Sequence, residues 1–546
     1  MKKKIDINLY SYILALGLLM ISIVTVALVV ERFFQEDYWA KDLYVKRAGL
    51  RRETFSSNYL KESENLLNNK ISIPSKKDYY WIYTGDMNKF KEENRSDQRY
   101  LYSFFMLNDL INAYEQTNKT IYLDKGYEYL EDFIDQCPYD FDPIYNMPWH
   151  DEATAQRMLN IVRFYKVAKI HLTEEKLRIL RENLEFTAEK LATEMYTGFN
   201  NHGMFQDLAL YSYGKAFNRQ DYVELSSKRL EDYFLGSFSK EGVHLENSPE
   251  YHYEMLCILK DFFRSSQEID FTRYGELKDI YKSSVNYSKS ILLPNGYTPN
   301  IGDTKRYKPD LTYLYTNEEI EAASKGGRHK FLESGYDIYK TKKAYLAFIG
   351  QSYLNYHHHD HDLSFWLYKD GDIITEAGKI GYDWDNPLTK YVRTYPAHNS
   401  VVIDKEESID PNIQDGEMFD LGENKMSAIS RRSSKADVKR DIEFDENLNK
   451  VSIQTSISSK DEKEHDYELY FHLAPGITAA YSDEGMDKVF LYRDNVEIGS
   501  FKASEEIEFK QDMYYPYSYA TGEKTLVLYI NTRGIDKIVD VEIRLD

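Results

Sequence analysis

The chain has 546 residues, which is too long for one ordinary domain and indicates at least two. Its formal net charge of −21 argues against nucleic acid as a partner, because a phosphate backbone attracts a basic surface. The only two cysteines, Cys137 and Cys257, exclude a disulfide framework and favour two unpaired, buried thiols.

The N-terminal segment predicts a membrane anchor over residues 1–31. Residues 9–30 contain no charged side chain, and a helix of this length spans a bilayer core of about 30 Å. Three lysines at positions 2–4 predict a cytoplasmic N-terminus, with the rest of the chain outside the cytoplasm. The alternative is a cleaved signal peptide and a secreted protein, since Thr25 and Ala27 are small residues at a suitable spacing.

A charged connector over residues 32–77 precedes a helical domain predicted at residues 78–330. Apolar residues recur there at spacings of three and four, as on one face of a helix. The predicted helices are residues 100–114, 154–171, 174–192, 206–216, 222–235 and 251–267. Because successive helices follow one another without a fixed sequence period, a bundle or an α/α toroid is expected.

From residue 331 to 546 the pattern changes to short alternating segments. Examples are residues 345–349, 400–403, 450–458, 467–472, 488–492 and 525–530, and Asp370-Gly371 marks a turn. Short strands at regular spacing indicate an antiparallel β-sandwich. The expected fold class is therefore a multidomain α + β protein, with a transmembrane helix, an α/α toroid and then the sandwich.

The richest chemistry in the chain is the run of four histidines and two aspartates at residues 357–362. It precedes the alternating residues 363–368. In an extended conformation His357, His359 and His361 would point to one side. Such a cluster suits metal binding or proton transfer, and the alternative is a solvated polar loop.

Six segments in chain order resemble motifs of one family. They are residues 149–157 (WHDEATAQR), 200–203 (NNHG), 246–252 (ENSPEYH), 301–304 (IGDT), 357–365 (HHHDHDLSF) and 397–404 (AHNSVVID). Together they resemble the heparinase II/III-like polysaccharide lyases, which include oligoalginate lyases. The resemblance spans nearly all of the chain past the predicted anchor. It implies an α/α toroid followed by an antiparallel β-sandwich.

The chemistry implied by this resemblance is β-elimination on a uronic-acid-containing polymer. A base removes the proton at C5, and the glycosidic oxygen at C4 leaves. The site must neutralise the carboxylate and place an acid and a base at the reacting atoms. By resemblance, Asn201 neutralises the carboxylate and His202 is an acid/base. Tyr251 is a base or acid, His357 is a second catalytic histidine, and Tyr382 matches a further tyrosine.

The resemblance also implies a structural zinc ion beside the cleft. The matching positions are His359, Glu376 and His398, and Glu376 stands where the family usually has Asp. Imidazole and carboxylate are ligands that zinc accepts. The remaining polar residues of the run, His358, Asp360 and His361, are expected to be solvated.

Substrate contacts are expected from an aromatic ring that stacks on sugar and from cationic groups that bind carboxylate. The candidates are Trp149, His150, Arg157, Lys305, Arg306 and Arg393. The expected partners are an acidic polysaccharide and, through the anchor, a membrane. Two other functions stay open at this point: a uronyl C5-epimerase that uses the same proton abstraction, and a non-catalytic glycan-binding protein. Neither the polymer nor the oligomeric state follows from the sequence.

Overall fold

The computed structural model describes residues 58–73, 76, 79–142, 146–323, 326–354, 356–382, 385–517 and 522–546. The predicted anchor lies outside these residues, as does most of the connector. Within the described ranges, every helix is too short or too polar to cross a bilayer. The chain forms two compact units. One holds the chain up to Tyr233 together with Ile258–Thr272, and the other holds Phe234–Cys257 together with Arg273–Asp546.

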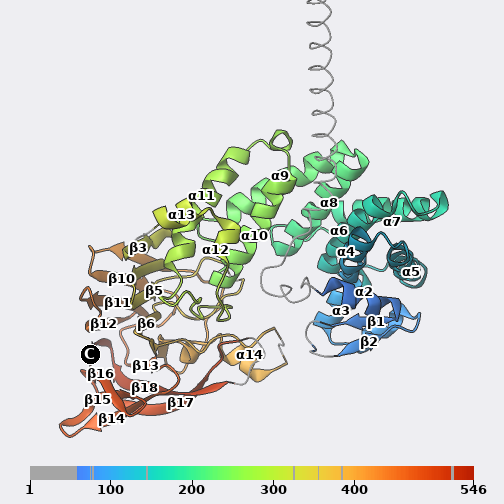
Figure 1. Cartoon of the computed structure of the whole chain (residues 1–546). Coiled ribbons are helices and arrows are strands. Elements are labelled where there is room, and N and C mark those ends of the chain that lie inside the picture. The colour runs from blue at the N-terminus through green and yellow to red at the C-terminus, as the bar shows by residue number, and fades with distance from the viewer. Residues whose placement is uncertain are drawn as a thin grey trace, which may run out of the picture. The chain divides into compact units, whose positions relative to one another are not determined.

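The first unit is built mainly of helices (Figure 1). They are α2 (Tyr59–Leu67), α3 (Arg95–Tyr102), α4 (Met106–Thr117), α5 (Ile121–Gln136), α6 (Asp151–Ala168), α7 (Glu174–Ala192), α8 (Asn201–Phe217) and most of α9 (Gln220–Ser237). The most extensive helix contacts of this unit join α6 with α8 and α2 with α4. A small antiparallel pair, β1 (Lys70–Ser72) with β2 (Tyr80–Ile82), accompanies them. The division between the units falls within α9 and within α10 (Pro249–Ser265).

The helices predicted from apolar spacing are confirmed where a side chain caps the helix end. Helix α7 has the predicted bounds, because Thr173 caps it by accepting a hydrogen bond from the Lys176 amide. The helix predicted at residues 100–114 is two helices instead. Phe104 adopts φ 55°, which ends one helix and redirects the chain before the next.

The second unit contains three antiparallel sheets and the helices α11 (Tyr274–Ser290), α12 (Leu311–Leu314), α13 (Asn317–Ala322) and α14 (Pro387–Tyr391). Five strands run in the order β3-β4-β5-β6-β7: β3 (Gly327–Phe331), β4 (Tyr336–Lys340), β5 (Ala344–Ile349), β6 (Phe365–Lys369) and β7 (Asp372–Ile374). Four run in the order β17-β18-β13-β8: β17 (Glu508–Tyr514), β18 (Glu523–Gly534), β13 (His465–His472) and β8 (Val401–Ile403).

The largest sheet has eight strands in the order β14-β15-β16-β19-β12-β11-β10-β9. They are β9 (Gly416–Asp420), β10 (Lys425–Ser430), β11 (Ala436–Phe444), β12 (Lys450–Ser459), β14 (Ile477–Ser482), β15 (Gly485–Arg493), β16 (Val496–Ala503) and β19 (Asp536–Leu545). The alternating burial of β11 and β12 shows that one face of this sheet is covered and the other faces solvent.

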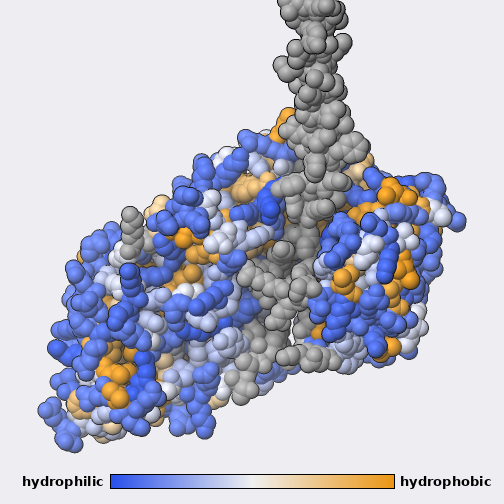
Figure 2. Space-filling view, in the orientation of Figure 1, coloured by the Kyte–Doolittle hydropathy of each residue, from blue (hydrophilic) through white to orange (hydrophobic). Residues whose placement is uncertain are grey.

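One apolar core joins the three sheets into a sandwich, as predicted. It includes Phe348 and Phe365 from the five-stranded sheet, Ile442 and Ile453 from the eight-stranded sheet, and Leu469 from the four-stranded sheet. The visible face of the molecule is mostly hydrophilic (Figure 2). Both cysteines are buried and form no disulfide with each other, which confirms that prediction.

The histidine-rich run is not extended, so the alternation considered for its side chains does not apply. His357 has φ 52° and Leu363 has φ 63°, and strand β6 begins only at Phe365. The expectation that parts of the run are solvated is also wrong. His358, Asp360 and His361 are buried, with exposed fractions of 9%, 2% and 1%.

An arginine explains why acidic residues of this run are buried. The Arg432 guanidinium lies 2.9 Å from a carboxylate oxygen of Asp360 and 2.8 Å from one of Asp362. Burial of a carboxylate is tolerated when a cation and hydrogen bonds replace its water. The partner is 70 residues away in the sequence, so spacing within the run does not reveal it.

A histidine at the start of β13 gives the sandwich a pH-dependent contribution to stability. The ring nitrogens of His465 lie 2.7 Å from a carboxylate oxygen of Asp404 and 2.9 Å from one of Asp461. Hydrogen bonds from Asp404 and then Asp461 raise the pKa of His465 above its usual range. A raised histidine pKa stabilises the fold below the unfolded-state pKa of about 6.5, and this stabilisation is lost as the pH rises through the folded-state pKa.

We therefore expect His465→Gln to lower the melting temperature more at about pH 5.5 than at about pH 8.5. The measurement is thermal unfolding of both proteins at the two pH values. His171→Gln, at an exposed histidine, serves as the control. An equal difference at both pH values would contradict the assignment.

Candidate active site

Two tyrosines and a histidine of the second unit form a connected group. The hydroxyl of Tyr251, in the first turn of α10, lies 2.9 Å from the hydroxyl of Tyr382. The Tyr382 hydroxyl lies 3.3 Å from Nδ1 of His357. The rings of Tyr251 and His357 are stacked, with centroids 3.5 Å apart. Three residues predicted from separate parts of the sequence are thus brought together.

Asn247 holds the loop that carries His357. Its side-chain amide donates to the carbonyls of Leu354 and Tyr356, over 2.6 and 3.1 Å. Its side-chain oxygen accepts from the Tyr353 amide at 3.1 Å. The same residue lies four positions before Tyr251, so one side chain fixes both the loop and the approach to α10. Sequence reasoning gave Asn247 no role.

Gly302 allows the next segment to approach this structure closely. A Cβ added there would lie 2.3 Å from the backbone oxygen of Asn247, and the residue has φ 54°. A larger side chain would therefore displace Asp303, the residue that follows.

Asp303 is a buried acceptor shared by three cationic or protonated groups. Its carboxylate oxygens lie 3.1 Å from Nδ1 of His357, 3.1 Å from Nε2 of His359 and 2.7 Å from the guanidinium of Arg393. Burial opposes ionisation, but hydrogen bonds from both histidines outweigh it and hold the pKa of Asp303 well below its usual range. A permanently ionised carboxylate thus orients the His357 ring. Nε2 of the same ring lies 3.4 Å from a carboxylate oxygen of Glu246.

The protonation state of Tyr251 follows from its surroundings. Desolvation, followed by the nearby Glu254 charge, raises the pKa of Tyr251 well above its usual range. The phenol is therefore neutral at physiological pH and carries a proton that it can donate. Tyr382 keeps 39% of its surface exposed, so its ring is accessible to a ligand.

Cationic side chains flank the tyrosines. Nζ of Lys379 lies 5.0 Å from the centre of the Tyr382 ring and 5.8 Å from that of Tyr251. It also lies 3.5 Å from a carboxylate oxygen of Glu250, which in turn lies 3.1 Å from Nζ of Lys305. Sequence reasoning missed Lys379, because no periodicity or motif distinguishes this buried lysine from the other lysines of the chain.

The other predicted cations of this unit differ in their partners. Arg393 bonds Asp303, and its guanidinium carbon lies 5.8 Å from the centre of the Tyr382 ring. Arg306 pairs with Asp372 at 2.8 Å. That pair anchors Arg306 to strand β7, so of the three predicted cations we keep Lys305 and Arg393 beside the tyrosines.

The predicted Asn-His turn lies in the first unit, at the start of α8. The side-chain oxygen of Asn200 caps the helix by accepting from the Gly203 amide at 2.9 Å. A Cβ at Gly203 would lie 2.0 Å from the Gly198 carbonyl oxygen, so this turn requires glycine. The cap places Asn201 and His202 in the first turn of the helix.

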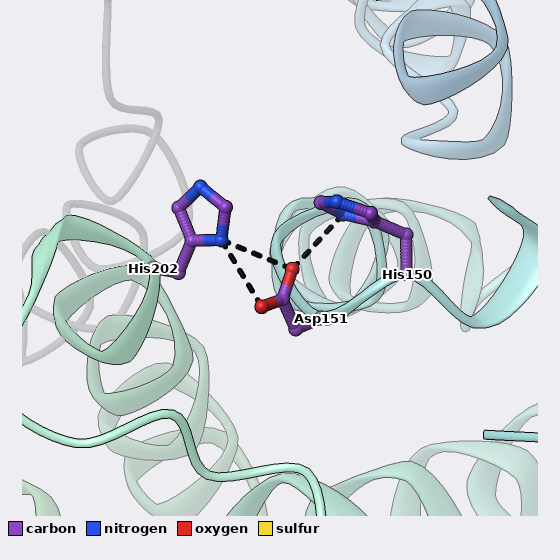
Figure 3. A group of neighbouring side chains, drawn as sticks. All are labelled: His150, Asp151 and His202. Atoms are coloured by element: carbon purple, nitrogen blue, oxygen red, sulfur yellow. Dashed lines mark hydrogen bonds and ion pairs between the residues drawn. The ribbon is translucent and has the colours of Figure 1, made fainter. Parts of the chain in front are cut away.

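His202 faces Asp151, the first residue of α6 (Figure 3), and also lies near Glu152. Its Nδ1 lies 3.1 Å from each carboxylate oxygen of Asp151, and its Nε2 lies 3.5 Å from one of Glu152. Nδ1 of His150 lies 3.0 Å from the same Asp151 carboxylate. The sequence motif therefore supplies a histidine-aspartate-histidine group within one unit.

Trp149 and Arg157 lie in the helical core, in place of the predicted contact with substrate. They are 3% and 1% exposed. The indole nitrogen of Trp149 donates to the Cys137 carbonyl, and the Arg157 guanidinium donates to the Tyr102 carbonyl. The guanidinium carbon of Arg157 also lies 4.1 Å from the centre of the Phe133 ring. Both side chains are thus accounted for by packing, and we do not retain them as substrate contacts.

The predicted metal ligands are only partly brought together. His361, Glu376 and His398 each offer a ligand atom, and these atoms lie within 4.8 Å of one another. His359 is not among these three residues, although its Nδ1 is buried without a hydrogen-bond partner among the described residues and its Nε2 contacts Asp303. Its ring centre lies 5.2 Å from that of His398. His359 therefore stays a predicted ligand, and His361 is a further candidate that sequence reasoning did not name as a ligand.

The chemistry of this buried group fits a divalent metal. Nδ1 of His361 and Nε2 of His398 are buried and have no hydrogen-bond partner among the described residues. Burial lowers the pKa of His361 to about 4, so the ring is neutral and keeps a lone pair. Two neutral imidazoles and the Glu376 carboxylate are a donor set that zinc accepts. The glutamate in place of aspartate is accommodated, since it reaches His398 directly.

Comparison with known families places this architecture. A heparinase II/III N-terminus profile matches residues 47–325, and a heparinase II/III-like C-terminal profile matches residues 323–534. The chain belongs to the heparinase II/III family. A search of curated proteins finds no match.

Solved structures share the heparinase fold, a toroid-like helical region followed by antiparallel sheets. A heparan sulfate lyase HepC mutant from Pedobacter heparinus aligns with a TM-score of 0.70 at 14% identity, over 94% of this chain and 87% of that chain. A crystal structure of heparinase III aligns with a TM-score of 0.74 at 13% identity, over 93% and 88%. A chondroitin AC lyase mutant from Streptomyces coelicolor aligns with a TM-score of 0.53 at 10% identity, over 94% and 82%. At these identities the likeness shows the fold alone.

Proposed function

We propose that this heparinase II/III family member is a polysaccharide lyase that cleaves a uronic-acid-containing polymer by β-elimination. The observation that carries the proposal is the chain of contacts from Tyr251 through Tyr382 to His357, with Asp303 behind His357. Proton transfer needs a donor, an acceptor and a group that orients them. Here these are a neutral phenol, an imidazole and a buried carboxylate in series. The lyases among the similar structures support the reaction class.

The elimination breaks two bonds of the sugar and forms one double bond. The C5–H bond breaks, its electrons form the C4–C5 double bond, and the C4–O bond breaks with a proton passing to the leaving oxygen. Neutral Tyr251 is the proton donor to that oxygen in our proposal. Tyr382, which contacts both Tyr251 and His357, connects the donor to a group that can return a proton.

The proton acceptor at C5 is His357 in our proposal. Lys379, Lys305 and Arg393 supply positive charge near the tyrosines. Positive charge is needed because the enolate-like intermediate adds to the charge of the carboxylate. A zinc ion held by His361, Glu376 and His398 would fix the loops of the sandwich. No step of the proposed reaction involves this ion.

We also propose that the reaction takes place outside the cytoplasm on a membrane-held enzyme. The uncharged residues 9–30, preceded by three lysines, support this placement. Heparan sulfate and chondroitin are named for similar structures, and both are acidic polymers, as are heparin, alginate and hyaluronan. The net charge of −21 makes the local cations the expected determinants of binding.

To test the proposal, the full-length protein is incubated with each of these polymers. The ultraviolet absorbance of the new C4–C5 double bond is the readout. We expect absorbance to rise with at least one uronate polymer and not with a neutral glucan. Parallel reactions in deuterated water separate the alternatives. Deuterium at C5 without absorbance would show an epimerase, and binding without either signal would show a glycan-binding protein.

A further inference from the structure

The group formed by His150, Asp151 and His202 has features that a hydrogen-bonded cluster does not explain (Figure 3). Each residue offers a ligand atom, and these atoms lie within 4.8 Å of one another. Both imidazoles turn the same atom, Nδ1, toward the Asp151 carboxylate, at 3.0 Å for His150 and 3.1 Å for His202. The three donors therefore converge on one point.

Nδ1 of His150 has no hydrogen-bond partner among the described residues. His150 is 6% exposed, and its Nδ1 forms no hydrogen bond to any described residue although an Asp151 oxygen is 3.0 Å away. Close donor atoms that are not aligned for a hydrogen bond are the arrangement found around a shared cation. A buried imidazole nitrogen left without a partner costs free energy that an ion would recover.

The negative charges of Asp151 and Glu152 are partly compensated within the protein. The guanidinium of Arg99, a nearby arginine, is paired with Glu152 at 2.7 Å. Helix α6 begins at Asp151, and its first backbone amides partly offset the carboxylate; the amide of Glu152 lies 2.6 Å from Oδ1. The second carboxylate oxygen is directed at His202, which keeps 29% of its side chain exposed.

We propose that His150, Asp151 and His202 bind a divalent transition-metal ion of the zinc class, separate from the group at His361, Glu376 and His398. Two imidazoles and one carboxylate leave one position of a tetrahedral ion open. The exposed side of His202 places that position toward solvent, where an anionic oxygen of carboxylate or sulfate chemistry can bind. Such an ion would bind an acidic sugar through that open position, and this last part rests on the proposed function.

The first experiment counts metal ions on the full-length protein prepared without a polyhistidine tag. After treatment with a chelator, the protein is equilibrated with Zn²⁺, and bound zinc per chain is measured by mass spectrometry of the metal. We expect His150→Ala and Asp151→Asn to bind one ion fewer than the wild type. His171→Ala removes an exposed histidine of the same unit and should bind as many ions as the wild type. Equal zinc content in all four proteins would overturn the proposal.

A second measurement uses only the wild type, so it holds even where a variant fails to fold. Histidine modification by diethyl pyrocarbonate is mapped by peptide mass spectrometry with and without Zn²⁺. We expect zinc to slow modification of His202 several-fold and to leave His171 unchanged. Equal modification of His202 in both conditions would show a hydrogen-bonded histidine-aspartate-histidine group without a metal. Neither readout uses lyase activity, so absence of the metal and absence of elimination are separate results.

Discussion

Replacing Tyr251 by phenylalanine is expected to lower kcat for elimination by about 10²–10⁴-fold, the usual contribution of a positioned acid or base. The variant removes only the hydroxyl that contacts Tyr382 at 2.9 Å and keeps the ring that stacks on His357. KM should change little, because the lost group acts on a proton and not on substrate binding. The measurement is initial velocity from ultraviolet absorbance over a range of polymer concentrations.

Tyr517→Phe is the matched control for this change. Tyr517 is a half-exposed tyrosine of the same unit, and its substitution should leave both kcat and KM unaltered. Tyr382→Phe should show a smaller loss of kcat than Tyr251→Phe, since in our proposal it returns the proton and does not contact the leaving oxygen. Full activity of Tyr251→Phe would remove the proton donor from the mechanism.

The second large effect is expected at Asp303. Asp303→Asn removes the buried carboxylate that pairs with the partly buried Arg393 guanidinium, and loss of one partner of a buried pair costs about 3–5 kcal/mol. The same change releases the His357 ring from its orienting carboxylate, so we expect kcat to fall by about 10²-fold or more where the protein is still folded. Chemical denaturation gives the free energy of unfolding, and activity is measured at a temperature where circular dichroism shows native structure.

A double variant separates charge burial from other effects. Asp303→Asn with Arg393→Gln removes both partners and should recover part of the lost stability, whereas activity should stay low because His357 remains without its carboxylate. Asp279→Asn, at an exposed carboxylate of α11, serves as the control and should be neutral. Additive losses of stability in the double variant would rule out the pairing as the source of the effect.

The pH dependence of this pair has a defined sign. Because the pKa of Asp303 is depressed in the folded state, its contribution is complete above the unfolded-state pKa of about 3.9 and is lost as the pH falls toward the folded-state value. The stability difference between wild type and Asp303→Asn should therefore narrow only below about pH 4.

The sequence pattern was sufficient for elements with regular periodicity and clear ends. Helix α7 and strand β5 follow directly from apolar spacing, and the Asp370-Gly371 turn joins β6 to β7 as predicted. Helix α5 was missed because its tyrosines and acidic residues dilute the apolar repeat. The break at Phe104 was missed because a positive φ at a phenylalanine is set by tertiary packing and not by local preference.

The active-site residues also fall into two groups: those that sequence resemblance identifies, and those whose role depends on tertiary contacts. The family motifs named Tyr251, His357 and Tyr382, and the structure brings them together. The partners that tune them, Asp303 and Asn247, lie within the family-like motifs but received no role, because a hydrogen bond across 54 or more residues leaves no periodic trace. Trp149 and Arg157 are residue types that often bind sugars, but both side chains are buried and cannot contact substrate. Their burial depends on how all the helices pack, which the sequence pattern does not show.

The hydrogen bonds by which Asn247 holds the loop of His357 affect how the energy of substrate binding can be used. Because Tyr251, His357, Tyr382 and Asp303 belong to one unit and are fixed by its backbone, the proton-transfer group is preassembled before any polymer arrives. Contacts along the sugar chain then need not supply energy to organise these side chains, and that energy remains for distorting the sugar toward its flattened reacting form.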